Sequence, residues 1–407
     1  MRVTLVPTSS VEAMRCIRLP HVLAALPALG GCIFAGCGGK GEPRTTAPLT
    51  LASVSAGGHH TCGLTTDSAA YCWGMNFSGQ LGNGRTSLWS TPVPVASGVR
   101  FAAVSAGGAY TCAVTAEGAA YCWGENDQGE FGDGTTTERS APTPVAGGVR
   151  FAAVSAGDNH ACGVTTAGTA YCWGNNWAGE LGDGTTTQRL TPVPVAGGLR
   201  FAALSAGSMH TCGVTAAGEA YCWGFNYDGR LGNDGPGPEF CGPDKRPCST
   251  VPVRVAGGER FSAVSAGTQH TCGITATGVA YCWAGNQLRP DGTMSDESRP
   301  LPVAGGVTFA AVSAGGDARH TCGVTAAGAA YCWGLGVFGE LGDSTTTRPQ
   351  SPVLVAGGLH FAAVSAGNNH TCGVTVAGAA YCWGLNADGQ LGDGTRTDRL
   401  SPVVVVR

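Results

Sequence analysis

The chain has 407 residues, of which 43% are hydrophobic and 12% charged, with 67 glycines, 22 prolines and 19 cysteines. This composition excludes a disordered chain, because apolar residues far outnumber charged ones, and the glycines lack the strict G-X-Y period of collagen. The formal net charge is −4, and Lys40 and Lys245 are the only lysines. Without a basic excess, the sequence argues against nucleic acid as a partner.

The first 37 residues have the pattern of an export signal. Arg15 and Arg18 precede an apolar run from residue 19 to residue 35, and a polar linker at residues 38–48 follows. Pro20 and Pro27 favour a cleaved segment over a membrane-spanning helix, because proline disrupts helix hydrogen bonding. Translation could begin at Met14, immediately before Arg15, as well as at Met1.

The segment Phe34-Ala35-Gly36-Cys37 resembles a bacterial lipobox, in which a peptidase cleaves before a cysteine that becomes lipid-modified. We therefore expect lipid attachment at Cys37, with Cys32 as the second candidate and an ordinary cleaved signal as the alternative. Each of these interpretations places the protein outside the cytosol, in the periplasm or at the cell surface. The only membrane contact expected is the lipid anchor.

A repeat of about 50 residues fills the rest of the chain. A tryptophan recurs at spacings of 50, 50, 50, 60, 50 and 50 residues, at Trp73, Trp123, Trp173, Trp223, Trp283, Trp333 and Trp383. The repeat units are residues 51–100, 101–150, 151–200, 201–260, 261–308, 309–360 and 361–407. Self-similarity at this period indicates a repeat architecture, here a domain spanning residues 49–407.

Each unit contains four short strand-like runs and no helical period. In the third unit these runs are residues 151–155, 161–165, 169–173 and 191–195, separated by glycine-rich or polar turns. One such sheet cannot bury both of its faces, so the units must stack on each other. The first and last units look like the middle ones and show no cap, which favours a closed ring. We therefore predict an all-β, seven-bladed β-propeller of four-stranded antiparallel blades.

The repeat resembles that of the regulator of chromosome condensation family. The resemblance rests on the segment from Ser155 to His160 and on Tyr171-Cys172-Trp173-Gly174, followed by Asn176, Gly179, Leu181 and Gly182-Asp183-Gly184. It recurs in every unit and implies seven-bladed propellers. Members of this family include a nuclear exchange factor for a small GTPase, a plant ultraviolet photoreceptor and a secreted bacterial inhibitor of β-lactamases. The family therefore implies a fold and no single activity.

Fourteen cysteines form seven pairs with the same spacing. They are Cys62 with Cys72, Cys112 with Cys122, Cys162 with Cys172, Cys212 with Cys222, Cys272 with Cys282, Cys322 with Cys332, and Cys372 with Cys382. A three-residue turn with Gly118 in the left-handed conformation would place Thr115 opposite Ala119 and Cys112 opposite Cys122, at a non-hydrogen-bonded site. We predict seven disulfides within blades and an eighth between Cys241 and Cys248, in an insertion of the fourth unit. Buried free thiols are the alternative. Ser68 replaces the turn glycine in the first unit, so we expect strain there.

The other recurrent polar residues suggest structural roles. Histidine recurs once per unit, at His60, His160, His210, His270, His320 and His370, with Tyr110 in the second unit. Single imidazoles spread around a ring cannot share a metal ion, so we expect them to bond backbone groups where the second strand begins. Asp133, Asp183 and Asp393 lack the spacing of a calcium loop and suit turns. The recurrent tryptophan suits the wedge between blades. No catalytic constellation, metal site or cofactor is predicted.

Differences between units concentrate in two loops. With the strands of each unit named A to D, an up-and-down blade places the A–B and C–D loops on one rim and the B–C and D–A connections on the other. The insertion at residues 235–249, the shortened loop at residues 285–298 and the extra residues near Asp317 all belong to the first rim. Aromatic residues there are candidate interface anchors: Phe77, Trp177, Phe225, Tyr227 and Phe338.

These observations predict a monomeric, non-enzymatic binding scaffold that recognises a protein or cell-envelope partner through the A–B/C–D face. The alternative is an inhibitor or regulator of an extracytoplasmic enzyme, as the resemblance to the β-lactamase inhibitor implies. A guanine-nucleotide exchange regulator is the third hypothesis, and export would separate it from such a substrate. Drift of solvent-exposed loops, with the aromatic residues turned inward, is the interpretation without a partner.

Overall fold

The structure is a computed structural model that describes residues 49–407 except residues 236, 243, 286, 289–293, 296–297 and 317–319. The predicted export signal and linker lie outside the described residues, as do the extra residues near Asp317 and much of the shortened loop at 285–298. No helix in the described part of the chain is long and apolar enough to cross a membrane.

The described residues are almost entirely β-structure. The first three blades contain β1 (Ser53–Ala56), β2 (His60–Leu64), β3 (Ala70–Gly74) and β4 (Trp89–Pro94); β5 (Ala103–Ala106), β6 (Tyr110–Val114), β7 (Ala120–Gly124) and β8 (Arg139–Pro144); and β9 (Ala153–Ala156), β10 (His160–Val164), β11 (Ala170–Gly174) and β12 (Arg189–Pro194). The fourth contains β13 (Phe201–Ala206), β14 (His210–Thr215), β15 (Ala220–Phe225), β16 (Glu239–Cys241) and β17 (Arg246–Arg254). The last three contain β18 (Phe261–Ala266), β19 (Thr271–Thr275), β20 (Ala280–Trp283) and β23 (Leu301–Pro302); β24 (Ala311–Ala314), β25 (Thr321–Val324), β26 (Ala330–Trp333) and β27 (Val353–Leu354); and β28 (Phe361–Ala366), β29 (His370–Thr375), β30 (Ala380–Gly384) and β31 (Arg399–Val404). A hairpin of β21 (Gln287–Leu288) with β22 (Met294–Ser295) and one 3-10 turn, η1 (Ala146–Gly148), complete the described elements.

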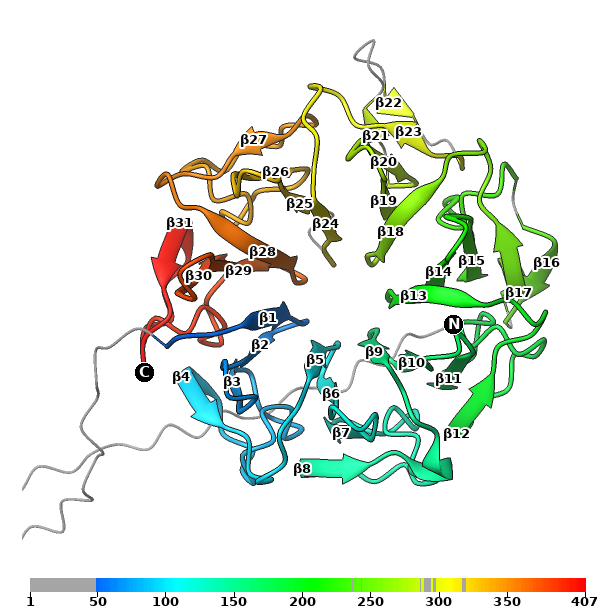
Figure 1. The fold of residues 1–407 in the computed structure, drawn as a ribbon, viewed down its shortest axis with the longest axis horizontal. Coiled ribbons are helices and arrows are strands. Elements are labelled where there is room, and N and C mark those ends of the chain that lie inside the picture. The colour runs from blue at the N-terminus through cyan, green and yellow to red at the C-terminus, as the bar shows by residue number, and fades with distance from the viewer. Residues whose placement is uncertain are drawn as a thin grey trace, which may run out of the picture. The chain divides into compact units, whose positions relative to one another are not determined.

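Seven antiparallel sheets surround a central axis, which confirms the predicted seven-bladed propeller (Figure 1). In six of the blades the strands pair in chain order, and each repeat unit makes one blade. The fourth blade gains a fifth strand, because β16 pairs with the outer side of β17. Strand A of each blade lies nearest the axis and strand D lies at the outside (Figure 1).

The B–C hairpins have the register that the turn chemistry predicts. Cys112 lies directly opposite Cys122, with a Cα–Cα distance of 4.1 Å, and Thr115 N donates to Ala119 O at 2.9 Å. Ser68 adopts the left-handed conformation, at φ 66°, that glycine takes in the other hairpins. Local turn chemistry therefore sets which cysteines face each other.

All eight predicted disulfides are present in the described residues, so the alternative of buried free thiols is wrong for these cysteines. The seven within blades join strand B to strand C, and the eighth joins Cys241 to Cys248. The seven are Cys62 to Cys72, Cys112 to Cys122, Cys162 to Cys172, Cys212 to Cys222, Cys272 to Cys282, Cys322 to Cys332, and Cys372 to Cys382. Each of the seven has the same Cα–Cα distance of 4.1 Å, so every blade repeats one hairpin geometry.

Backbone and serine hydrogen bonds join each blade to the next around the axis. Gly58 N donates to Gly107 O at 2.9 Å, and equivalent bonds continue around the ring to Asn368 N, which donates to Gly57 O at 3.2 Å. The strand-A serines accept from the strand-A backbone of the following blade, ending with Ala56 N to Ser365 Oγ at 3.0 Å. Because the last blade bonds the first as every other pair does, the ring is closed.

The recurrent histidines also connect blades, which corrects the expectation that they bond backbone groups. His60 Nε2 lies 2.8 Å from Thr111 Oγ1 of the next blade, and the other five histidines make the same contact. Thr111 Oγ1 donates its proton to Gln80 O at 2.9 Å, so it must accept from the imidazole. His60 therefore carries its proton on Nε2. The prediction missed this threonine because the contact lies 51 residues away in the chain.

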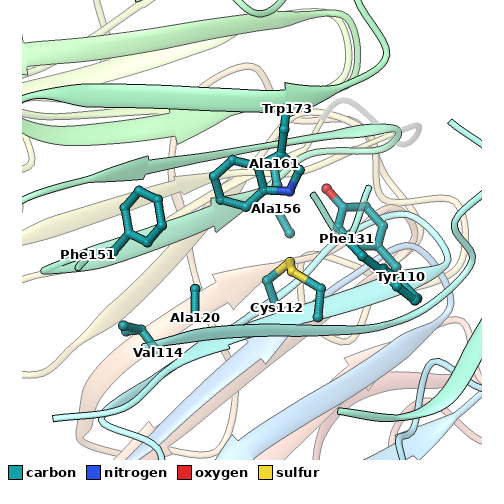
Figure 2. Close-up of a cluster of buried hydrophobic side chains, with 10 residues drawn as sticks. Tyr110, Cys112, Val114, Ala120, Phe131, Phe151, Ala156, Ala161 and Trp173 are labelled. Carbon is teal, nitrogen blue, oxygen red and sulfur yellow. A yellow bond between two sulfur atoms is a disulfide. The ribbon is translucent and has the colours of Figure 1, made fainter. Parts of the chain in front are cut away.

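The seam between the second and third blades lacks this histidine–threonine hydrogen bond, and both residues differ there. Tyr110 replaces the histidine in the second blade, and Ala161 replaces the threonine in the third. The Tyr110 hydroxyl donates to His160 O at 2.5 Å instead. Both side chains are fully buried in one cluster with Trp173 (Figure 2). The two substitutions compensate for each other, because an imidazole here would face a methyl group in place of a hydroxyl.

The recurrent tryptophan fills the wedge between blades, as predicted. Trp123 packs against Cys62, Leu64 and Leu81 of the preceding blade, and its indole N–H donates to Gln80 O at 2.9 Å.

At the ring closure, Leu51 occupies the position that phenylalanine occupies in the other six units. Leu51 N donates to Gly378 O at 2.8 Å, and its side chain packs with Trp73 and Val374. The segment just before the first strand of the first blade is therefore bonded to the B–C turn of the last blade.

Candidate functional site

The A–B and C–D loops emerge together on one rim of the ring. Met75 N donates to His59 O, and Phe225 N to Met209 O, both at 2.9 Å, so the start of each C–D loop lies beside an A–B loop. On the opposite rim the D–A connections meet the B–C turns, as Phe151 N donates to Gly118 O at 2.9 Å. We name the first the variable rim and the second the turn rim.

Buried asparagines hold the long C–D loops in shape. Asn176 Nδ2 donates to the carbonyl oxygens of Thr185 and Thr187, both at 3.0 Å, while its Oδ1 accepts from Leu181 N at 3.0 Å. Asn76, Asn126 and Asn386 make equivalent bonds in their own loops. These bonds within the chain therefore set the conformation of the loop without a partner, and they fix the backbone next to Trp177, which follows Asn176.

Three of the predicted aromatic anchors form a stack that crosses from the third blade to the fourth. The ring centroids of Trp177 and Phe225 are 6.2 Å apart, those of Phe225 and Tyr227 are 6.3 Å apart, and both pairs are inclined by 29°. Arg230 lies 4.9 Å from the Phe225 centroid and Arg246 lies 4.8 Å from the Tyr227 centroid. We name Trp177, Phe225 and Tyr227 the aromatic ladder. Tyr227 is 62% exposed, whereas its two partners are half-buried.

The insertion of the fourth blade supports this ladder from outside. Its strands β16 and β17 pair antiparallel, and the Cys241–Cys248 disulfide joins them. Gly242 lies directly against the Trp177 indole, because a Cβ there would be 2.7 Å from Trp177 Cε2. Phe240 of this hairpin is 66% exposed and was not among the predicted anchors. Its position in the only long insertion was the signal that could have identified it.

The other two predicted anchors lie apart from the ladder. Phe77 belongs to the first blade and is 64% exposed, while Phe338 belongs to the sixth and is 40% exposed. No ring contact joins either of them to another aromatic side chain among the described residues. The structure thus exposes these two side chains at separate places on the variable rim.

Several acidic side chains of the variable rim are partly or fully buried. In the second blade, burial and the nearby charges of Asp127 and Glu138 raise the pKa of Glu125. Burial raises the pKa of Glu130 to about 8 and that of Glu180 to about 7. Arg230 is also buried, where it pairs with Asp228 and donates to Thr268 O at 2.7 Å. The carboxyls of Glu130 and Glu180 therefore hold a proton more readily than an exposed glutamate does.

The described residues offer no cluster of free metal ligands. The one cluster with metal-ligand spacing is Glu239, Cys241 and Cys248, whose sulfurs are joined in a disulfide. Asp133, Asp183 and Asp393 each accept hydrogen bonds from the threonine two residues later, as the turn interpretation predicts. At the axis, the glycine ring leaves a depression of about 100 Å³, well below the ~300 Å³ that a small-molecule site typically needs.

The repeat sequence identifies the family. A model of the regulator of chromosome condensation (RCC1) repeat matches residues 67–114, 117–164, 167–214, 217–274, 327–374 and 377–406, and a second model of this repeat matches residues 52–80, 101–130, 151–179, 201–230 and 361–390. The chain belongs to the RCC1 repeat family. Each match of the first model begins in a B–C turn, and all but the last run on through strand B of the following unit. The RCC1 repeat is therefore offset from the structural blade.

Solved structures with the same architecture come from distant proteins. Human WBSCR16 is 18% identical over 83% of this chain and 94% of that chain, with a TM-score of 0.73. Prp20p from Saccharomyces cerevisiae, studied for its binding to Gsp1p and histones, is 22% identical over 78% and 80%, with a TM-score of 0.63. The ectodomain of the Arabidopsis thaliana receptor kinase ACR4 is 21% identical over 86% and 98%, with a TM-score of 0.50. At these identities the likeness shows the fold alone. No curated protein matches this chain significantly.

Proposed function

We propose that this protein is an exported β-propeller, anchored by a lipid at Cys37, that binds a protein or cell-envelope partner through its variable rim. The observation that carries the proposal is the aromatic ladder, in which Tyr227 is 62% exposed and is held in place by Phe225 and Arg246. Tryptophan, tyrosine and arginine are the residue types that dominate binding energy in protein interfaces. Because the stack is already formed in the free protein, binding loses little conformational entropy in ordering these side chains.

Export is supported by the cysteine chemistry. Eight disulfides stabilise the described residues, and disulfides persist in oxidising compartments outside the cytosol. Protein binding is supported by analogy, because Prp20p, a propeller of similar shape, binds Gsp1p and histones. The ACR4 domain, another similar propeller, is the ectodomain of a receptor. The specific partner of this chain is left open by both comparisons.

The binding proposal is tested by capture of partners with the purified mature protein. The double variant Trp177→Ala plus Tyr227→Ala removes the two ends of the aromatic ladder, and we expect at least a ~10-fold loss of affinity, since truncating a hot-spot residue commonly costs about 2 kcal/mol or more. Val376→Ala, at a 73% exposed apolar residue of the turn rim, is the matched control. If every partner bound the ladder variant as tightly as the control, the variable rim would not be the binding face.

A second candidate function is inhibition of an extracytoplasmic enzyme. The observation that favours it is the hairpin of β16 and β17, in which Phe240 is 66% exposed and lies next to the Cys241–Cys248 disulfide. A rigid hairpin with an exposed aromatic residue can occupy an active-site cleft with little ordering cost. The discriminating measurement is the activity of a captured enzyme with saturating propeller. A loss of turnover that Phe240→Ala relieves supports inhibition, and unchanged turnover supports a binding scaffold.

A further inference from the structure

The two rims carry different charge. Every described Asp, Glu, Arg and Lys can be assigned to one of the two rims. In this assignment the first residue of strand D belongs to the C–D loop, and Arg254, the last residue of β17, belongs to the turn rim. The variable rim then has seventeen acidic and ten basic residues, and the turn rim has four acidic and six basic residues. The basic residues of the turn rim are all exposed: Arg100, Arg150, Arg200, Arg254, Arg260 and Arg407. The propeller is therefore electrostatically polar along its axis.

The chain reaches the propeller at the turn rim. Thr50 forms a β-bridge with Ala379, and Leu51 N donates to Gly378 O, both in the B–C turn of the last blade. Residues 38–48 separate this point from Cys37 and can span at most about 40 Å when fully extended. A lipid on Cys37 would therefore tether the propeller from its turn rim.

The turn rim also contains a hollow lined by two arginines and a glutamate. A depression of about 440 Å³ lies between the first and second blades, and its lining includes Arg100, Arg150, Glu117 and Tyr121. Arg100 Nη1 lies 2.9 Å from Asp67 Oδ2, and Arg150 Nη1 donates to the Glu117 carbonyl oxygen at 3.3 Å. These bonds occupy one nitrogen of each guanidinium. The remaining N–H groups have the fork geometry that binds phosphate oxygens.

We propose that the turn rim is the membrane-facing surface of this protein. Arg100 and Arg150 lie against anionic phospholipid headgroups, and the variable rim points away from the bilayer. The negative surface potential of an anionic leaflet attracts the arginines and repels the acidic variable rim, so charge and attachment point favour the same orientation. The orientation rests on the lipid anchor of the proposed function. It leaves the aromatic ladder free to meet partners.

Orientation is measured by the reactivity of single lysines. The mature chain from residue 38, with an N-terminal decahistidine in place of the lipidated cysteine, is attached to phosphatidylcholine vesicles containing a nickel-chelating lipid, with or without phosphatidylglycerol. In a Lys40→Arg background, Lys245 reports on the variable rim and Arg200→Lys introduces a reporter on the turn rim. An impermeant amine-reactive reagent labels both, and mass spectrometry follows the rates.

We expect attachment to slow labelling at position 200 by about fivefold or more and to leave Lys245 within about twofold of the free protein, with stronger protection on phosphatidylglycerol. Equal or greater protection of Lys245 would overturn the orientation. Arg100→Gln plus Arg150→Gln should weaken protection on anionic vesicles, whereas Arg348→Gln on the variable rim should not. Unchanged protection in the double variant would remove the arginines from the proposal. The mass of the Cys37 peptide from cells tests the natural lipid separately, because the decahistidine anchor does not depend on it.

Discussion

The seam between the second and third blades allows a quantitative test of how the ring is joined. Six seams use a hydrogen bond between a histidine and a threonine of the next blade, and one uses Tyr110 with Ala161. Tyr110→His alone would direct a buried imidazole N–H at a methyl group, which costs about 1–3 kcal/mol for the unsatisfied donor. Ala161→Thr alone would add two heavy atoms to a fully buried site beside the Tyr110 ring, which costs about 1–3 kcal/mol by overpacking.

The double variant Tyr110→His plus Ala161→Thr rebuilds the arrangement of the other seams. The new threonine hydroxyl would lie where Thr111 and Thr211 lie, each of which donates at 2.9 Å to the loop carbonyl of the preceding blade. We expect its stability to be within about 1 kcal/mol of the natural chain, so the interaction energy in the cycle should reach about 2 kcal/mol or more.

The assay is equilibrium unfolding in guanidinium at pH 7.5 with the disulfides intact, followed by tryptophan fluorescence. The reciprocal cycle, His60→Tyr and Thr111→Ala at the first seam, is the matched control and should show coupling of the same sign. Additive single effects in both cycles, with interaction energies below about 0.5 kcal/mol, would refute the pairing.

Three further predictions concern local features. Ser68→Gly should stabilise the protein by about 1 kcal/mol, because Ser68 has a φ of 66° and a non-glycine residue there costs about 1–2 kcal/mol; Gly118→Ser, at φ 84°, should destabilise, and equal midpoints for both would contradict the turn assignment. Stability should fall as the pH is lowered from 7 to 5. Burial lowers the pKa of His60, His320 and His370 to about 3 and that of His160 to about 4, so the unfolded chain takes up protons below its ordinary histidine pKa of about 6.5 while the folded chain does not. The raised pKa values of Glu125, Glu130, Glu180 and Glu340 act in the opposite direction but involve fewer groups than the five histidines whose pKa burial lowers, so a midpoint that rises on acidification would contradict this balance. Cys241→Ser plus Cys248→Ser should leave the unfolding midpoint of the ring nearly unchanged but weaken partner binding, because this disulfide shapes the hairpin against Trp177; unaffected binding would separate the hairpin from the site.

Features set within one repeat were predictable from the sequence. The spacing of tryptophans gave the number of blades, and a turn with Gly118 fixed the register that places Cys112 opposite Cys122. The division into two rims follows from strand alternation alone, and the hydrogen bond from Met75 N to His59 O is in accord with it. Local chemistry and periodicity determine these features, so they needed no knowledge of neighbouring blades.

Features formed between repeats were harder to predict. The partner of each histidine lies in the next blade, and the joint departure of Tyr110 and Ala161 was the one sequence signal for it. Stacking of Trp177 on Phe225 also crosses a seam, whereas Phe77 and Phe338 occupy similar loops without joining the ladder. Periodicity places such residues on a rim but does not say which of them meet, because that depends on the rotation between blades and on the unique hairpin at residues 239–248.

Binding through the variable rim is tested most directly by site-specific photo-crosslinking in intact cells. A photoreactive amino acid at Tyr227 reports on the aromatic ladder, and one at Val376 reports on a position of the turn rim that is at least as exposed. The account predicts a discrete protein or cell-wall adduct from position 227 that disappears with Trp177→Ala, and no such adduct from position 376. An adduct formed from position 376 and absent from position 227 would contradict it.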